Sequence, residues 1–131
     1  ETHVSTGIAG TFGYIPPEYG QSWKVTLKGD VYSYGVILFE LLTGKAPTGS
    51  EFKEAEGGNL VGWVKKQMMA KKEIINSLDA IIDPSIRGKC PINVSWKLLQ
   101  LATLCTSEVP LNRPSMLQVV KYLKHLENLG I

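Results

Sequence analysis

The chain has 131 residues, of which 44% are apolar and 20% charged; this is ordinary for a globular protein and argues against a disordered one. The net charge is +2 and the basic residues are scattered rather than gathered beside aromatic ones, so nucleic acid is not an expected partner. Cys90 and Cys105 have neither C-x-x-C spacing nor a histidine at metal-ligand spacing, which favours a reduced, intracellular setting without a metal site.

The beginning of the chain predicts a loop and then a central helix. The first thirty residues are rich in Gly, Pro, Thr and Ser, which indicates an extended loop with a short helical turn near Glu18. Over residues 30–43, apolar side chains cover nearly every direction of a helical wheel, so we expect a helix with no face left for water. Gly44 is its expected left-handed stop. The longest apolar run, within residues 36–42, is too short to cross a bilayer, so we expect no membrane insertion by this segment.

A second predicted helix, over residues 59–71, follows a loop over residues 45–58. Asn59 is the expected N-cap, and apolar residues recur at three- and four-residue steps, which is typical of an amphipathic surface helix. This spacing leaves three lysines on the outer face: Lys65, Lys66 and Lys71. Such a face suits either plain solvation, which we favour, or contact with anionic lipid.

The last part of the chain predicts three more helices. Residues 73–87 predict a short helix and a docking loop, because Asp83-Pro84 disfavours continued helix. Residues 95–106 are apolar on more than one face, which predicts a buried helix. The final helix, over residues 115–128, begins with a capping box formed by Ser115 and Gln118. Its expected apolar stripe consists of Met116, Val119, Val120, Leu123 and Leu126.

Common catalytic patterns are missing from the sequence. Gly7, Gly10 and Gly13 have neither dinucleotide-binding nor P-loop spacing, and there is no G-x-S-x-G or H-E-x-x-H motif. The two histidines, His3 and His125, lie near opposite ends of the chain. Since no strand pattern or internal repeat emerges either, the predicted fold class is mainly α, built around one buried central helix.

Three ordered motifs carry a family resemblance. Residues 10–19 read G-T-F-G-Y-I-P-P-E-Y, residues 29–35 read G-D-V-Y-S-Y-G, and residues 113–116 read R-P-S-M. Together they resemble the C-terminal part of the kinase domain of plant leucine-rich-repeat receptor-like serine/threonine kinases, with Pro16 replacing the Ala of A-P-E and Tyr32 replacing a Trp. The resemblance implies that residues 1–131 form the helical part of a kinase C-lobe, with the end of the activation segment in residues 1–20. It also implies a parent receptor that holds this segment on the cytoplasmic side of the plasma membrane.

The resemblance assigns roles to particular positions. Glu18 and Arg113 would form a buried ion pair between the activation segment and the helical floor, and Asp30 would accept hydrogen bonds from the catalytic loop. Thr11 would also contact the catalytic loop. The substrate-binding residues would be Thr11, Phe12, Gly13, Tyr14 and Ile15, and the candidate phosphorylation sites are Thr2, Ser5 and Thr6.

The motifs that bind ATP and transfer phosphate in kinases do not occur in this sequence. There is no glycine-rich loop, H-R-D or D-F-G motif, so we expect ATP and magnesium to be used only by the full-length parent, and this chain to be inactive alone and marginally folded. Expected partners are protein substrates, co-receptor kinases, and the N-lobe and catalytic loop of the parent. Two alternatives are a pseudokinase or truncated interaction module, and an unrelated helical bundle in which Glu18 and Arg113 lie far apart.

Overall fold

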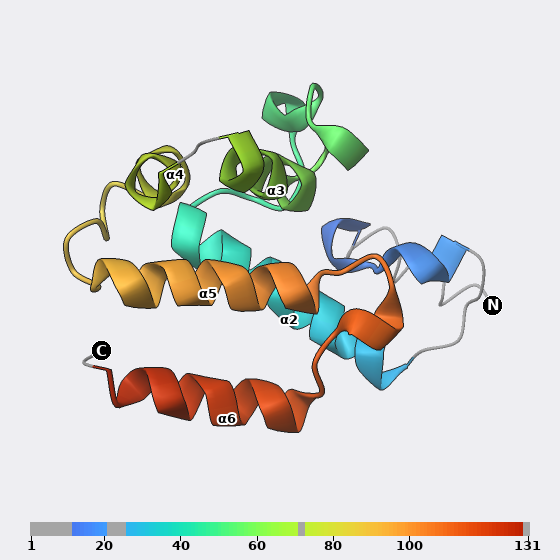
Figure 1. The fold of residues 1–131 in the computed structure, drawn as a ribbon. Helices are drawn as coiled ribbons and strands as arrows, with labels where there is room; N and C mark the ends of the chain where they lie inside the picture. Colours follow the sequence, from blue (N-terminus) through green and yellow to red (C-terminus); the bar gives the residue numbers. More distant parts are fainter. Residues whose placement is uncertain (1–11, 21–25, 71–72, 130–131) are drawn as a thin grey trace.

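A computed structural model describes residues 12–20, 26–70 and 73–129, and these form an assembly of helices (Figure 1). The α-helices in chain order are α2 (Leu27–Thr43), α3 (Leu60–Ala70), α4 (Ile74–Ile81), α5 (Ile92–Cys105) and α6 (Met116–Glu127). α5 lies along α2, α3 and α4 lie on one side of this pair, and α6 runs along the other side (Figure 1). The predicted mainly-α fold around a central helix is confirmed.

Helix α2 begins three residues earlier than the expected range of 30–43. Its N-cap is Thr26, whose hydroxyl oxygen accepts a hydrogen bond from the Gly29 amide at 3.0 Å. Asp30 therefore lies inside the first turn. The helix ends as predicted, because Gly44 adopts a left-handed conformation with φ of 72° and its amide donates to the Glu40 carbonyl at 2.8 Å.

One expectation about α2 is wrong, because the helix is not covered on every side. Val36 and Phe39 are fully buried in the core, and Gly35 lies directly against the end of α5. Ile37 and Leu41, however, are 45% and 69% exposed. The described helices α3 and α5 pack on two sides of α2, and no described element covers the side that carries these two residues.

Helix α3 is capped as predicted and differs from the prediction at Lys65. The Asn59 side chain accepts a hydrogen bond from the Gly62 amide at 3.0 Å, and Leu60 and Val64 are fully buried. Lys66 faces outward, but Lys65 is half-buried and its Nζ donates to the Thr106 carbonyl at 2.8 Å. Burial lowers the pKa of Lys65. Its aliphatic stem allows it to cross apolar surface and reach a buried carbonyl, which periodicity alone does not reveal.

Residues 82–91 form the predicted docking loop after the short helix α4. The Asp83 amide donates to the Leu42 carbonyl at 2.8 Å, which fixes this loop to the end of α2. α5 then begins at Ile92, three residues before the expected start, because Pro91 supplies the carbonyl that accepts from the Val94 and Ser95 amides at 3.0 Å.

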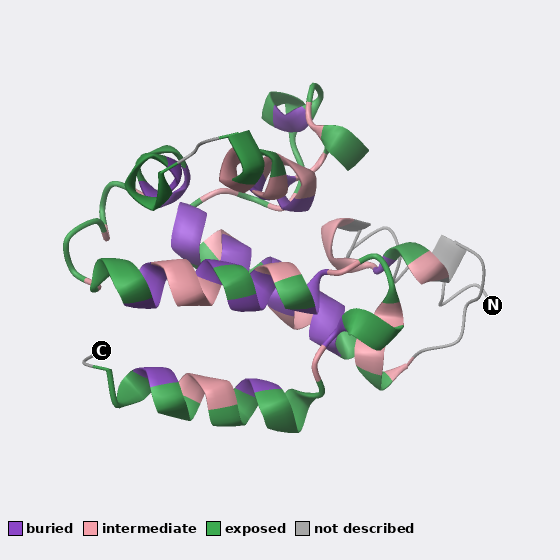
Figure 2. Ribbon diagram, in the orientation of Figure 1, coloured by how far each residue is buried: buried purple, intermediate pink, exposed green. Residues whose placement is uncertain are grey.

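Helix α6 has the predicted capping box but only part of the predicted buried stripe. The Ser115 hydroxyl accepts from the Gln118 amide at 3.1 Å, and the Gln118 side chain accepts from the Ser115 amide at 2.8 Å. Val119 and Leu126 are buried, whereas Met116 and Val120 are more than 40% exposed, and most of α6 is exposed in Figure 2. No helix within the described ranges has the length and apolar character needed to cross a membrane.

Candidate functional site

A buried arginine joins the beginning and the end of the described chain. Arg113 follows a short turn, Pro110–Asn112, and Glu18 lies in the short 3-10 helix Pro17–Gly20. The two Glu18 carboxylate oxygens accept from Arg113 Nη1 at 2.6 Å and from Nη2 at 2.8 Å. The Arg113 side chain is fully buried and that of Glu18 is 22% exposed. This is a bidentate ion pair, the geometry in which guanidinium and carboxylate interact most strongly.

Arg113 also binds the backbone of two further segments. Its Nε donates to the Ser107 carbonyl at 2.8 Å, and Nη1 donates to the Lys28 carbonyl at 3.1 Å. The guanidinium carbon lies 4.9 Å from the centroid of the Tyr32 ring, within the range of a cation–π contact. We call these groups, with Glu18, the Arg113 cluster. It fastens the start of α2 and the turn after α5 to one side chain.

The electrostatics of the cluster follow from this geometry. The hydrogen bonds from Arg113 lower the pKa of Glu18 below its ordinary value of 4.5, against the opposing effect of burial. Burial raises the pKa of Tyr32, so its phenol stays neutral beside the ion pair. The Glu18 carboxyl is therefore held in its charged form at neutral pH.

The predicted substrate loop covers residues 11–15, and the part of it that the structure describes is fixed to α2. The Tyr14 hydroxyl donates to Glu40 Oε1 at 2.7 Å, and the Ser33 hydroxyl donates to the Tyr14 carbonyl at 2.8 Å. The hydrogen bond to Glu40 is the main cause of a raised Tyr14 pKa. Gly13 packs so closely on Pro47 that an added Cβ would lie 2.6 Å from the proline Cβ. The sequence prediction did not include Ser33 or Glu40, although a lone carboxylate within the apolar run 36–42 is a signal that could have identified Glu40.

Several predicted site residues lie outside the described part of the chain. They are Thr11 and the candidate phosphorylation sites Thr2, Ser5 and Thr6. Phe12 begins a short 3-10 helix, Phe12–Tyr14, of which only the backbone is described at Phe12. The roles assigned to these residues remain predictions.

A pocket lies beside Ile15, between the substrate loop and α3. Its volume is about 240 Å³, and Ile15, Pro17 and Tyr32 contribute apolar lining. Two carboxylate residues, Glu56 and Glu108, and the ammonium residue Lys65 also line it. The arrangement suits an amphipathic side chain rather than a nucleotide. Among the described residues, no three His, Cys, Asp or Glu side chains come together as ligands for a metal ion.

Asp30 is placed on the side of α2 that the described elements leave uncovered. It is exposed, and no described group donates a hydrogen bond to its carboxylate. Ile37 and Leu41 follow it at intervals of seven and four residues, so the three share one face of the helix. We call this surface the open face of α2. It combines a carboxylate with exposed apolar area, as expected of a face that docks another part of a protein.

Comparison with known proteins identifies the family. Residues 2–123 match the family model of the protein tyrosine and serine/threonine kinases. The chain is 56% identical to the leucine-rich repeat receptor protein kinase EMS1 of Arabidopsis thaliana over 126 residues, and 50% identical to the leucine-rich repeat receptor protein kinase MSP1 of Oryza sativa subsp. japonica over 129 residues. These matches cover 96% and 95% of the chain but only 10% and 9% of the two relatives. The chain therefore spans about a tenth of their length.

A solved structure agrees with these matches. The pseudokinase domain of BIR2, an immune regulator of the RLK/Pelle family, superimposes with a TM-score of 0.73 at 37% sequence identity, covering 92% of this chain and 34% of that one. The alternative of an unrelated helical bundle is wrong, because Glu18 contacts Arg113 directly and the helix that carries Asp30 is central. The chain belongs to the protein tyrosine and serine/threonine kinase family, of which it forms the helical part of the C-lobe.

Proposed function

We propose that the chain is part of a receptor-like serine/threonine kinase that transfers the γ-phosphate of ATP to protein hydroxyls in signalling. In this kinase the chain supplies the substrate-facing loop and the helical floor beneath it. The observation that carries the proposal is the fixation of residues 13–18 on α2 and on the turn before α6 through two separate contacts, Tyr14 with Glu40 and Glu18 with Arg113. A loop held at both places keeps one shape, which phosphoryl transfer requires for positioning its acceptor.

The substrate loop and the Ile15 pocket would receive the protein substrate. The apolar lining from Ile15 and Pro17 suits the side chain that follows the phosphorylated residue, while Glu56 and Glu108 favour basic groups nearby. Thr11 would contact the catalytic loop. Phosphates on Thr2, Ser5 or Thr6 would each add about −1.5 to −2 charges and require a basic partner.

The open face of α2 would dock the catalytic loop. The Asp30 carboxylate would accept hydrogen bonds from the backbone amides of that loop, and Ile37 and Leu41 would be covered by the same layer. Nucleotide chemistry would come from other parts of the parent kinase. Support comes from the sequence, which has no phosphate-binding glycine loop.

Two measurements test this proposal. The chain alone should show no stoichiometric binding of MgATP by titration calorimetry, and such binding would contradict our view of its role. The kinase domain that contains the chain should transfer labelled phosphate from ATP to serine and threonine in protein substrates. Failure of the transfer, in a domain that is folded by circular dichroism, would refute activity.

A second candidate function is that of a pseudokinase or a truncated interaction module. The observation in its favour is the match to BIR2, whose solved domain is described as a pseudokinase. The two candidates differ in whether H-R-D and D-F-G motifs are present elsewhere in the parent, because these hold the catalytic base and the metal. Reading the coding sequence around this segment distinguishes them without an assay.

The proposed setting is the cytoplasmic side of the plasma membrane, as part of a membrane receptor. Support comes from the receptor kinases to which the chain is similar. The partners that follow from this setting are protein substrates and co-receptor kinases. Co-purification of the parent from plasma membranes, with the kinase domain accessible to protease only after permeabilisation, would test the location.

A further inference from the structure

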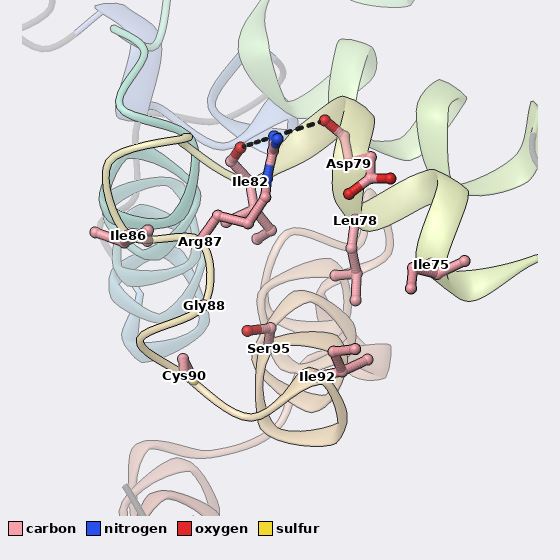
Figure 3. A pocket seen from close by; sticks show the side chains of 10 residues that line it. All are labelled: Ile75, Leu78, Asp79, Ile82, Ile86, Arg87, Gly88, Cys90, Ile92 and Ser95. Atoms are coloured by element: carbon pink, nitrogen blue, oxygen red, sulfur yellow. Dashed lines mark hydrogen bonds between the residues drawn. The ribbon is translucent and has the colours of Figure 1, made fainter.

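A second pocket lies away from the substrate loop in sequence, between α4, the loop after it and the start of α5 (Figure 3). Its volume is about 240 Å³, which is enough for a small organic molecule. Five aliphatic side chains line most of it: Ile75, Leu78, Ile82, Ile86 and Ile92. We call it the α4–α5 pocket. Its walls favour an apolar ligand.

One polar side chain inside the α4–α5 pocket has no partner. Ser95 is only 7% exposed, and no described group forms a hydrogen bond with its hydroxyl. Figure 3 shows this hydroxyl directed toward the loop that carries Gly88 and Cys90. Because Ser95 lines the pocket, a molecule bound there can reach this hydroxyl. A ligand with one hydrogen-bond acceptor would satisfy it.

Two charged residues line the pocket, Arg87 and Asp79. Arg87 Nη2 donates to the Asp79 carbonyl at 2.8 Å and to the Ile82 carbonyl at 3.0 Å, so this nitrogen caps the end of α4 (Figure 3). Asp79 is exposed, so its carboxylate is open to water. The interior thus offers aliphatic surface and one hydroxyl, which suits an uncharged ligand better than an ionic one.

The pocket also contains a thiol. Cys90 lines it and is half-buried, so a molecule bound there would lie against this residue. Cys105 differs, because it is fully buried in the core and burial raises its pKa to about 11. Of these two cysteines, the one in the pocket is accessible to a bound reagent.

We propose that the α4–α5 pocket binds small, uncharged, mostly apolar carbonyl compounds and directs α,β-unsaturated members of this class to Cys90. The Ser95 hydroxyl would donate to the ligand carbonyl while the aliphatic walls enclose its hydrocarbon part. In the covalent step the Cys90 sulfur, after losing its proton to water, bonds to the β-carbon. The carbon–carbon double bond opens, and the α-carbon takes a proton from water. The product is a thioether, with no leaving group and no oxidation or reduction.

The test compares two reagents of the same reaction type on the folded kinase domain that contains the chain. 2-Cyclohexenone is apolar and cyclic, whereas acrylamide is small and hydrophilic. Rates of modification at Cys90 are measured by peptide mass spectrometry in the native protein and in guanidinium chloride. We expect the rate ratio of cyclohexenone to acrylamide to be about tenfold higher in the native protein, equivalent to about 1.4 kcal/mol of preferential binding. Equal ratios in the two states would overturn the proposal.

A saturated ketone and three variants locate the effect. Cyclohexanone cannot form the adduct, and we expect it to slow cyclohexenone at Cys90 in the native protein only. Ser95→Met should fill the pocket and abolish the preference, and Ser95→Ala should weaken cyclohexanone protection by about three- to tenfold through loss of one hydrogen bond. Ser85→Met is the control for the same change of residue type, since Ser85 is exposed in the loop after α4 and does not line the pocket. No protection by cyclohexanone, or an equal effect of Ser85→Met and Ser95→Met, would refute binding in this pocket.

Discussion

Replacing Glu18 by Gln tests whether the Arg113 cluster holds the fold together. The change keeps the shape of the side chain but removes its charge, and it turns an amide NH2 toward one of the two Arg113 donors. Removing one partner of a buried ion pair is destabilising by about 3–5 kcal/mol. Glu18 is 22% exposed, so water can reach part of the site, and we expect the lower end, about 3 kcal/mol.

Arg113→Met should destabilise the protein more than Glu18→Gln. Besides the ion pair, it leaves the Ser107 and Lys28 carbonyls without the donors that Arg113 provides. A hydrogen bond from a charged donor contributes about 1.5–3 kcal/mol, so these losses add to that of the ion pair. Urea unfolding of the kinase domain, followed by tryptophan fluorescence, gives the free energy of unfolding of both variants. If Glu18→Gln lowers the free energy of unfolding by less than about 1 kcal/mol, the ion pair is no stronger than an ordinary surface salt bridge, and our reasoning is refuted.

The pH dependence of the same variant has a defined sign. Because the folded-state pKa of Glu18 is lowered from 4.5, its ionisation adds stability that is fully present above 4.5 and is lost as the pH falls through the folded value. The gap in unfolding free energy between the wild type and Glu18→Gln should therefore shrink on acidification below 4.5. A gap that stays constant or widens would show that the charge of Glu18 is not what stabilises the fold.

Three further substitutions probe the packing of the helices by urea unfolding. Gly35→Ala should lose about 1–2 kcal/mol despite its gain in helix propensity, because the new Cβ would lie 2.7 Å from Cβ of Cys105; an unchanged or higher stability would contradict this contact. Gly44→Ala should lower the free energy of unfolding by about 1–2 kcal/mol, because Gly44 has φ of 72° and the new Cβ would meet the Asp83 carboxylate. The control is Gly58→Ala, which has a similar φ of 63° but open space around it, so its loss of stability should be smaller. Ser115→Ala should lose about 1 kcal/mol with its cap, and a neutral result would mean that α6 does not depend on its capping box.

Local chemistry explains which elements the sequence could predict. Gly44, Asn59 and Ser115 each act on backbone groups within four residues, so their patterns are visible without knowledge of the fold. Thr26 is a cap of the same kind. The sequence pattern does not reveal it, because the apolar pattern of the helix starts only after Asp30 and the first turn lacks a buried stripe.

Tertiary contacts explain what the sequence could not predict. Ile37 and Leu41 have the composition of a core, and only the arrangement of the other helices shows that they are exposed. Lys65 has the spacing of a solvated residue, yet its ammonium group donates a hydrogen bond to a carbonyl at the end of α5, so its side chain is half-buried. The partners Glu18 and Arg113 are 95 positions apart, so no periodicity connects them. Their pairing was accessible only through the order of motifs shared with a family.

The geometry of α2 connects the substrate loop to the rest of the site. Ser33 and Glu40, which hold Tyr14, are seven residues apart and form one stripe of the helix. Asp30, Ile37 and Leu41 form the open face, and the helical repeat places this stripe about 60–80° from the first. The two stripes are therefore neighbours on one rigid helix, whose far side is fixed by α5. Any element that docks on the open face is held beside the substrate loop by the backbone of α2 itself. Under the proposed function, α2 would therefore set the geometry of phosphoryl transfer without supplying a catalytic residue.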